Sequence, residues 1–123
     1  MSTILVADDD RLTRQLLTRC LSTAGHHVVV ASNGREALEM MNEQSIDLVL
    51  MDMNMPELDG WTAACKINVE FQKRVPIVAV TSYGLPADKA RAATAGCGSF
   101  LSKPIDLRAL MLTVNDALKP RPK

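Results

Sequence analysis

The sequence predicts an α/β fold in which a five-stranded parallel sheet carries helices on both faces. Three observations support this prediction. Continuous runs of valine, isoleucine and leucine recur along the chain, which is typical of strands buried on both faces of a parallel sheet. Segments with apolar residues at helical spacing separate these runs, so that strand and helix alternate five times. A length of 123 residues fits one domain.

Five apolar segments are the predicted strands. They are TILVA at 3–7, HVVVA at 27–31, IDLVLM at 46–51, PIVAV at 76–80 and SFL at 99–101. Because such runs are typical of strands covered on both faces, and strands alternate with helices, the pattern favours a parallel sheet with helices on both sides.

The predicted helices follow these strands. Apolar residues keep helical spacing within 12–21, 37–41 and 107–118, and Asp106 is placed to cap the last helix. Segments 61–71 and 86–95 have weaker helical patterns. The domain is predicted to span 1–118, and 119–123, with two prolines, is a tail or the start of a linker.

The composition excludes several classes of protein. Fourteen basic residues balance fourteen acidic ones, which argues against direct binding of nucleic acid through net charge. No run approaches the roughly 20 apolar residues needed to span a membrane. Three scattered cysteines with no Cys-x-x-Cys pair fit free thiols in a reducing compartment. A cytoplasmic protein with no membrane contact is therefore expected.

Polar residues follow four of the predicted strands. They are Asp8, Asp9 and Asp10 after the first, Asp52 after the third, Thr81 and Ser82 after the fourth, and Lys103 after the fifth. The carboxyl ends of parallel strands meet at one edge of the sheet, where ligands bind in such folds. We therefore expect these side chains to form one site.

The chemistry of that site follows from its residue types. Crowded carboxylates repel one another, and a hard divalent cation relieves the repulsion. Oxygen ligands favour Mg²⁺ over zinc, since His26 and His27 lie at the opposite end of the sheet. Lys103 and the Thr81 hydroxyl suit a phosphoryl group, with Asp52 as the nucleophile.

Each of these residues also has a simpler interpretation. Asp10 is more readily a helix N-cap than a third metal ligand. Lys103, which precedes a proline, could be a surface lysine in a turn, and Thr81 could merely cap the following helix. Because Lys103 and Thr81 occur together with Asp52 at the same predicted edge of the sheet, we prefer the interpretation as site residues.

Four motifs in order resemble the receiver domain of two-component response regulators. They are ILVADDD at 4–10, LVLMDMNMPELDG at 48–60, VAVTS at 78–82 and FLSKPI at 100–105, and the resemblance covers 3–118. The last two motifs are most similar to receivers of phosphorelays, whether stand-alone or linked to hybrid kinases.

The resemblance implies a flavodoxin-like fold with strand order 2-1-3-4-5 and a role for each site residue. It implies that Asp52 accepts a phosphoryl group, and that Asp8, Asp9, Asp52 and the backbone carbonyl of Asn54 hold Mg²⁺. Thr81 and Lys103 would contact the phosphoryl group, and Thr81 and Phe100 would form the conformational switch. Apart from the resemblance, we expect Asn54, Ser82 and Tyr83 to modulate the reaction, because they lie close in sequence to Asp52 and Thr81.

The leading function is thus phospho-acceptor signalling rather than enzymatic turnover. The donor would be a histidine kinase or a histidine phosphotransfer protein, and a downstream protein would bind the face formed by 86–118. The alternative is an aspartyl-phosphate phosphatase or phosphotransferase acting on a small substrate. Such an enzyme usually needs an acid two residues after the nucleophile, where this chain has Asn54. A phosphorylation-independent interaction module is disfavoured by the intact Asp52, Thr81 and Lys103.

Overall fold

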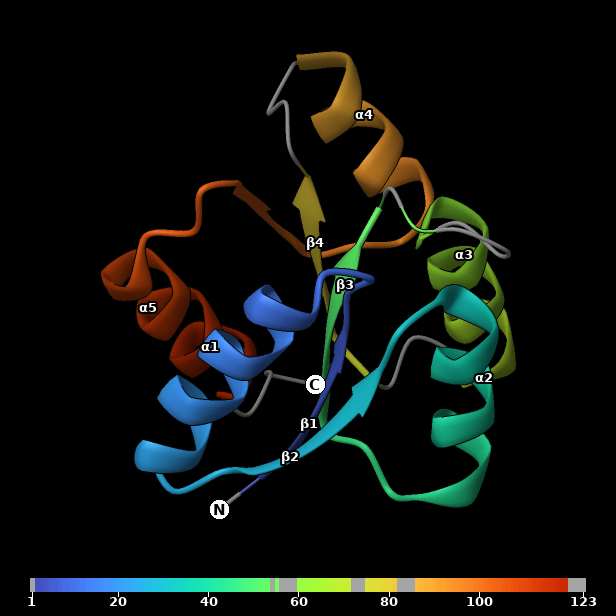
Figure 1. The fold of residues 1–123 in the computed structure, drawn as a ribbon. Helices are drawn as coiled ribbons and strands as arrows, with labels where there is room; N and C mark the ends of the chain where they lie inside the picture. The colour runs from blue at the N-terminus through green and yellow to red at the C-terminus, as the bar shows by residue number, and fades with distance from the viewer. Residues whose placement is uncertain (1, 54, 56–59, 72–74, 82–85, 120–123) are drawn as a thin grey trace.

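Five strands and five helices alternate along the part of the chain that this computed structural model describes, namely residues 2–53, 55, 60–71, 75–81 and 86–119 (Figure 1). The strands are β1 (Thr3–Ala7), β2 (His27–Ala31), β3 (Leu48–Asp52), β4 (Ile77–Thr81) and β5 (Ser99–Ser102). The helices are α1 (Arg11–Thr23), α2 (Gly34–Glu43), α3 (Gly60–Glu70), α4 (Pro86–Thr94) and α5 (Leu107–Ala117).

The strands form one parallel sheet in the order β2-β1-β3-β4-β5. The predicted α/β fold and the implied strand order are therefore confirmed. Every residue of β3 and β4 is buried, because these central strands have helices on both sides. The continuous apolar runs in the sequence reflect that double burial.

Three strands end one residue later than the apolar pattern predicts. β3 ends at Asp52, β4 at Thr81 and β5 at Ser102. The polar side chain ends the apolar run, but the backbone continues in the sheet, with Asp52 opposite Val80 and Thr81 opposite Ser102. The side chains of Asp52 and Thr81 are consequently placed by the sheet rather than by a loop.

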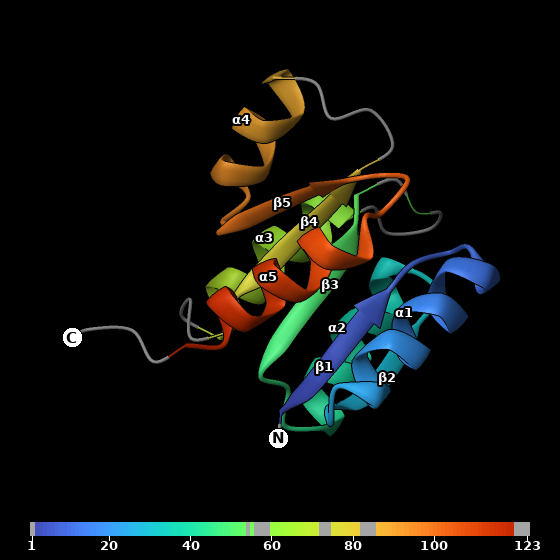
Figure 2. The same ribbon diagram turned by 90° about the vertical axis from the view of Figure 1, so that its left-hand side faces the viewer.

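The helices divide between the two faces of the sheet. Figures 1 and 2 show α1 and α5 together on one face and α2 and α3 on the other. Leu17 and Leu21 of α1 pack with Leu110 and Val114 of α5 in one core. The second core contains side chains from α2, α3 and α4. No helix within the described ranges combines the length and the apolar character that crossing a bilayer requires.

Within the described residues, three helices are preceded by a residue whose side chain accepts a hydrogen bond from the backbone of the first turn. These N-caps are Asp10 for α1, Asn33 for α2 and Asp106 for α5. Such caps satisfy amides that would otherwise lack a partner in the helix. The N-cap interpretations of Asp10 and Asp106 are confirmed.

Helix α4 is tied to α3 at its carboxyl end. The Asn68 side-chain amide donates to the backbone carbonyl of Ala95, with a nitrogen–oxygen distance of 2.9 Å. Gly96 follows with a φ of +93°, and a Cβ at this position would overlap the Asn68 side chain. Gly96 is therefore needed both for its backbone conformation and for the space it leaves to Asn68.

Candidate functional site

Three carboxylates meet at the carboxyl edge of the sheet. Asp8 and Asp9 follow β1, and Asp52 ends the neighbouring strand β3. One carboxylate oxygen from each lies within 4.8 Å of the others. Asp8 and Asp52 are each only 2% exposed, whereas Asp9 is exposed. The predicted acidic cluster is therefore brought together, with two of its members buried.

Lys103 supplies the opposite charge. Its Nζ lies 3.1 Å from Asp8 Oδ2 and 3.3 Å from Asp52 Oδ2. Burial lowers the pKa of Lys103, but the hydrogen bonds that its ammonium donates to Asp8 and Asp52 and the charges of both carboxylates outweigh that effect, so the pKa is raised overall. Lys103 is thus a charged partner of the cluster and not a surface lysine in a turn.

Thr81 lies beside this group. It ends β4, which is the strand between those of Asp52 and Lys103, and it is 1% exposed. The Lys103 backbone amide donates to the Thr81 carbonyl at 2.7 Å, which joins the ends of β4 and β5. Three adjacent strand ends therefore carry the hydroxyl, the lysine and the carboxylate.

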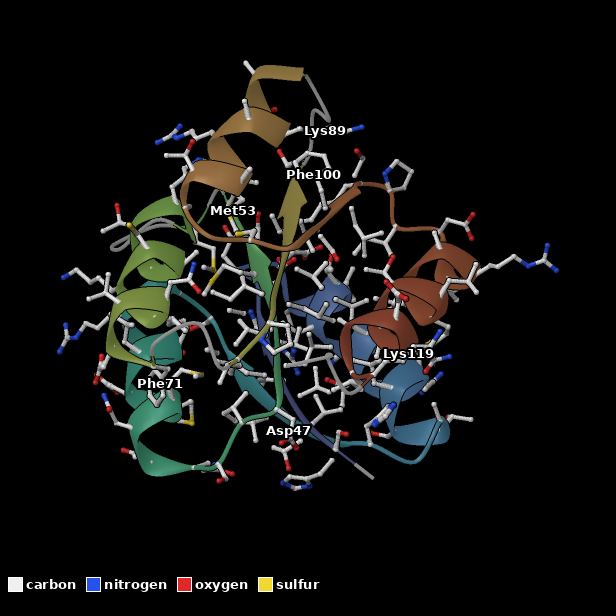
Figure 3. All side chains as sticks on the ribbon, turned by 180° about the vertical axis from the view of Figure 1, so that it is seen from behind. Asp47, Met53, Phe71, Lys89, Phe100 and Lys119 are labelled. Atoms are coloured by element: carbon white, nitrogen blue, oxygen red, sulfur yellow. The ribbon has the colours of Figure 1, made fainter. Side chains whose placement is uncertain are left out.

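Phe100 lies on β5, two residues before the end of that strand at Ser102. Its ring is partly buried against the core that contains the α4 residues, and Lys89 of α4 lies with its Nζ 5.9 Å from the ring centroid. Figure 3 shows Phe100 and Lys89 near each other at the α4 end of the molecule, far from Asp47. Phe100 is therefore in contact with α4.

Asp10 has a structural role as the N-cap of α1. Its carboxylate accepts from the Leu12 amide at 3.3 Å and from the Thr13 hydroxyl. The bond from Thr13 lowers the pKa of Asp10 and outweighs the slight effect of burial. The predictions for Asn54, Ser82 and Tyr83 concern residues that lie outside the described ranges.

Two features of the site were not predicted from the sequence. Arg14, in the first turn and a half of α1, donates through Nη1 to the backbone carbonyl of Asp8 at 2.7 Å. Gly60 begins α3 so close to β3 that a Cβ there would lie 2.6 Å from the Met53 Cα and would also overlap the Asp52 carbonyl. The sequence does not predict this contact, because a close approach between two backbones has no local sequence pattern.

The donor set of this cluster fits a divalent metal ion. Carboxylate oxygens from Asp8, Asp9 and Asp52 are hard ligands that can converge on one point. His27 begins β2, at the opposite edge of the sheet, so it cannot join them. The acidic cluster could therefore bind a metal ion through oxygen atoms.

Comparison with known proteins assigns the chain to a family. Residues 4–115 match the response regulator receiver domain. The chain belongs to this family. Receiver domains are signalling domains, which pair with histidine kinases and act on downstream effectors, and the resemblance stated from the four motifs is confirmed. This receiver domain thus functions in phospho-acceptor signalling.

Individual relatives are similar over nearly the whole receiver domain. The transcriptional regulatory protein GlrR of Escherichia coli is 36% identical over 116 residues, which are 94% of this chain and 26% of GlrR. The sensor histidine kinase RcsC of Salmonella typhi is 38% identical over 111 residues, or 90% of this chain and 12% of RcsC. The chain therefore spans about a quarter or less of the length of these two relatives.

Two further relatives match along their own full length. The polar-differentiation response regulator DivK of Brucella anthropi is 28% identical, with 94% of each chain covered. The chemotaxis protein CheY4 of Vibrio cholerae has a solved structure that matches with a TM-score of 0.91 and 30% identity, covering 96% of this chain and 99% of CheY4. The receiver fold is thus matched both in short proteins and within longer ones.

Proposed function

We propose that Asp52 accepts a phosphoryl group from a phosphohistidine and that this transfer depends on Mg²⁺. The observation that carries the proposal is the position of Asp52, a buried carboxylate that ends a central strand next to both Lys103 and the acidic pair Asp8 and Asp9. A buried carboxylate in such company suits a rigidly held nucleophile better than a purely structural role.

The transfer uses the side chains of the site as follows. An oxygen of Asp52 forms a bond to phosphorus while the bond from phosphorus to the donor histidine nitrogen breaks, and the imidazole keeps the electron pair. Lys103, already paired with Asp52, neutralises one phosphoryl oxygen, and the Thr81 hydroxyl donates a hydrogen bond to another. The donor is a histidine kinase or a histidine phosphotransfer protein.

The acidic residues are the proposed metal ligands. Asp8, Asp9, Asp52 and the backbone carbonyl of Asn54 would hold Mg²⁺. When bound, the ion offsets the negative charge that gathers as a phosphoryl group approaches the carboxylates. Because Mg²⁺ keeps several of its waters, three carboxylates and a carbonyl suffice as protein ligands. Asn54, Ser82 and Tyr83 are proposed as modulators of the reaction.

The output is a change in the face that comprises α4, β5 and α5, within 86–118. A hydrogen bond from Thr81 to the new phosphoryl group draws Thr81 inward, and Phe100 follows into the space released. A downstream protein then binds the altered face. The predicted alternative, an aspartyl-phosphate phosphatase or phosphotransferase, gains no support, since the matched family is one of signalling domains.

Phosphorylation of the purified protein tests the proposed acceptor. With a small-molecule phosphodonor and Mg²⁺, we expect a mass gain of one phosphoryl group that is lost in alkali. Asp52→Asn should abolish the gain, because an amide is neither anionic nor nucleophilic. Asp116→Asn, at an exposed position on α5, is the matched control and should be phosphorylated normally. A retained label in Asp52→Asn would move the acceptor to Asp8 or Asp9.

A further inference from the structure

Every hydrogen-bonding group of Asp8 has a partner. Its amide donates to the Ala31 carbonyl at 3.0 Å, and its Oδ1 accepts from the Asp10 amide at 2.8 Å. Its Oδ2 pairs with Lys103 at 3.1 Å, and its carbonyl accepts from Arg14 at 2.7 Å. The orientation of Asp8 is therefore determined at four atoms by four other residues.

The contact with Arg14 fixes more than Asp8 itself. The Asp8 carbonyl belongs to the peptide group that joins Asp8 to Asp9, and a peptide group is planar. A guanidinium that holds this oxygen therefore sets the plane from which the backbone of Asp9 continues. Asp9 is exposed, so its neighbours restrain it less than the core restrains Asp8.

Arg14 is itself held firmly. It lies on α1, with its amide bonded to the Asp10 carbonyl at 3.0 Å, and its side chain is half-buried. Glu36, at the start of α2, accepts from the Ser32 amide at 2.7 Å and from the Ser32 hydroxyl at 2.6 Å. These bonds are the main reason that the pKa of Glu36 is lowered, and the positive charge of Arg14 contributes to the same shift. The side chain of Arg14 thus bonds to the segment after β1, and its charge also acts on Glu36 after β2.

We propose that Arg14 is a positioning residue for the metal site, which orients Asp8 and Asp9 by holding the peptide group between them. This inference rests on the proposed role of these carboxylates as Mg²⁺ ligands. The proposed role supports Mg²⁺ binding, whereas the positive charge of Arg14 by itself would weaken it. Partners that orient metal ligands in this way typically contribute about tenfold or more to metal affinity.

Charge and position make opposite predictions for this residue. A cation close to the acidic cluster repels Mg²⁺, so removing its charge should strengthen metal binding if electrostatics alone matter. Removing the hydrogen bond to the Asp8 carbonyl should instead weaken binding, because the carboxylates then sample orientations that do not converge. The sign of the change in affinity therefore separates the two effects.

Magnesium titration of the full chain tests the proposal. Trp61 is the single tryptophan, it is buried, and it follows Gly60, whose backbone packs against that of Asp52. We therefore expect its fluorescence to change when Mg²⁺ binds, and isothermal titration calorimetry measures the same binding independently of Trp61. We expect Arg14→Gln to raise the Kd for Mg²⁺ about tenfold. Arg14→Lys, which keeps the charge and one donor, should lie between Arg14→Gln and wild type.

Arg19→Gln is the matched control, since it removes the same charge from an exposed position on the same helix. It should leave the Kd unchanged or slightly lower. Thermal melts with and without Mg²⁺ provide the second readout: a merely structural role would lower both melting temperatures equally, whereas a positioning role also reduces the increase that Mg²⁺ produces. If Arg14→Gln fails to fold, Arg14→Lys is compared with wild type: it keeps the charge, so weaker Mg²⁺ binding supports the positioning role and unchanged binding refutes it.

Two results would overturn the proposal and they are distinguishable. Equal or tighter Mg²⁺ binding in Arg14→Gln, relative to Arg19→Gln, would refute the positioning role while leaving the metal site intact. No saturable Mg²⁺ binding in the wild-type protein would refute the proposed metal site, and the role of Arg14 with it.

Discussion

Lys103 balances two carboxylates that have little access to water. Its ammonium contacts Asp8 and Asp52, and each of these is 2% exposed. A buried carboxylate that loses its partner retains the full cost of its desolvation. The same lysine that is proposed to contact the phosphoryl group therefore also stabilises the unphosphorylated fold.

Lys103→Met should reduce the free energy of unfolding by about 1–3 kcal/mol in the absence of metal, because it leaves two buried acceptors without their cation. Urea denaturation measures this loss. Added Mg²⁺ should restore part of it, since the ion supplies positive charge at the same carboxylates. Lys119→Met is the control. Lys119 is exposed and 3.9 Å from Asp116, so its substitution should change the free energy of unfolding by close to zero. Equal losses in both variants would contradict the expectation.

At the scale of elements, α4 depends on contacts that differ from those of the other helices. Among the α4 side chains that the structure describes, Ala92 alone is buried. The Arg91 guanidinium lies 4.5 Å from the centroid of the Trp61 ring of α3. Lys89 lies over Phe100 of β5. Contacts between a cation and an aromatic ring at exposed sites contribute about 0.5–1 kcal/mol each. α4 is thus attached partly through weak contacts, which a small rearrangement can break and replace with others.

This attachment leads to a prediction for the proposed switch. Phosphorylation should shift the NMR signals of Thr81, Phe100 and α4 together, because one new hydrogen bond to Thr81 biases a packed element with two arrangements. Thr81→Ala should still accept a phosphoryl group but lose the shifts in α4 and Phe100. The reason is that the hydroxyl that links the phosphoryl group to the helix is missing.

Thr94→Ala is the matched control for this experiment. Its hydroxyl donates to the Ala90 carbonyl within α4, away from the acidic cluster, so its removal should leave the response to phosphorylation intact. A full response of α4 in phosphorylated Thr81→Ala would show that the coupling does not pass through Thr81.

At the scale of the whole molecule, the sequence predicted the layers and the edge at which the site lies. Apolar runs marked the strands, and polar residues at their ends marked a common edge. The contacts of Arg14 with Asp8 and of Arg91 with Trp61 were not predictable, because each depends on the direction of a long side chain across separate elements. The ends of β3, β4 and β5 were each placed one residue too early, because the hydrogen-bonded ladder of the sheet continues past the last apolar residue to a polar one.

Burial across the molecule also predicts where it opens first. Backbone amides of β3 and β4 should exchange with solvent only through global unfolding, since every residue of these strands is buried. Amides of α4 should exchange through local opening at much lower free energy, because most of its side chains face solvent. Native-state hydrogen exchange measures both. Equal protection in α4 and β3 would rule out an independently opening helix.

The bond between Asn68 and Ala95 makes α4 a lever. One end of the helix is anchored to α3 where Gly96 leaves space for the Asn68 side chain, so any tilt of α4 would displace the opposite end most. Nine helical residues extend about 13 Å, so a tilt of about 10° displaces the Pro86 end by about 2 Å while the anchored end hardly moves. A partner that binds the Pro86 end of α4 would therefore encounter a larger displacement, and one that binds near Ala95 would encounter almost none.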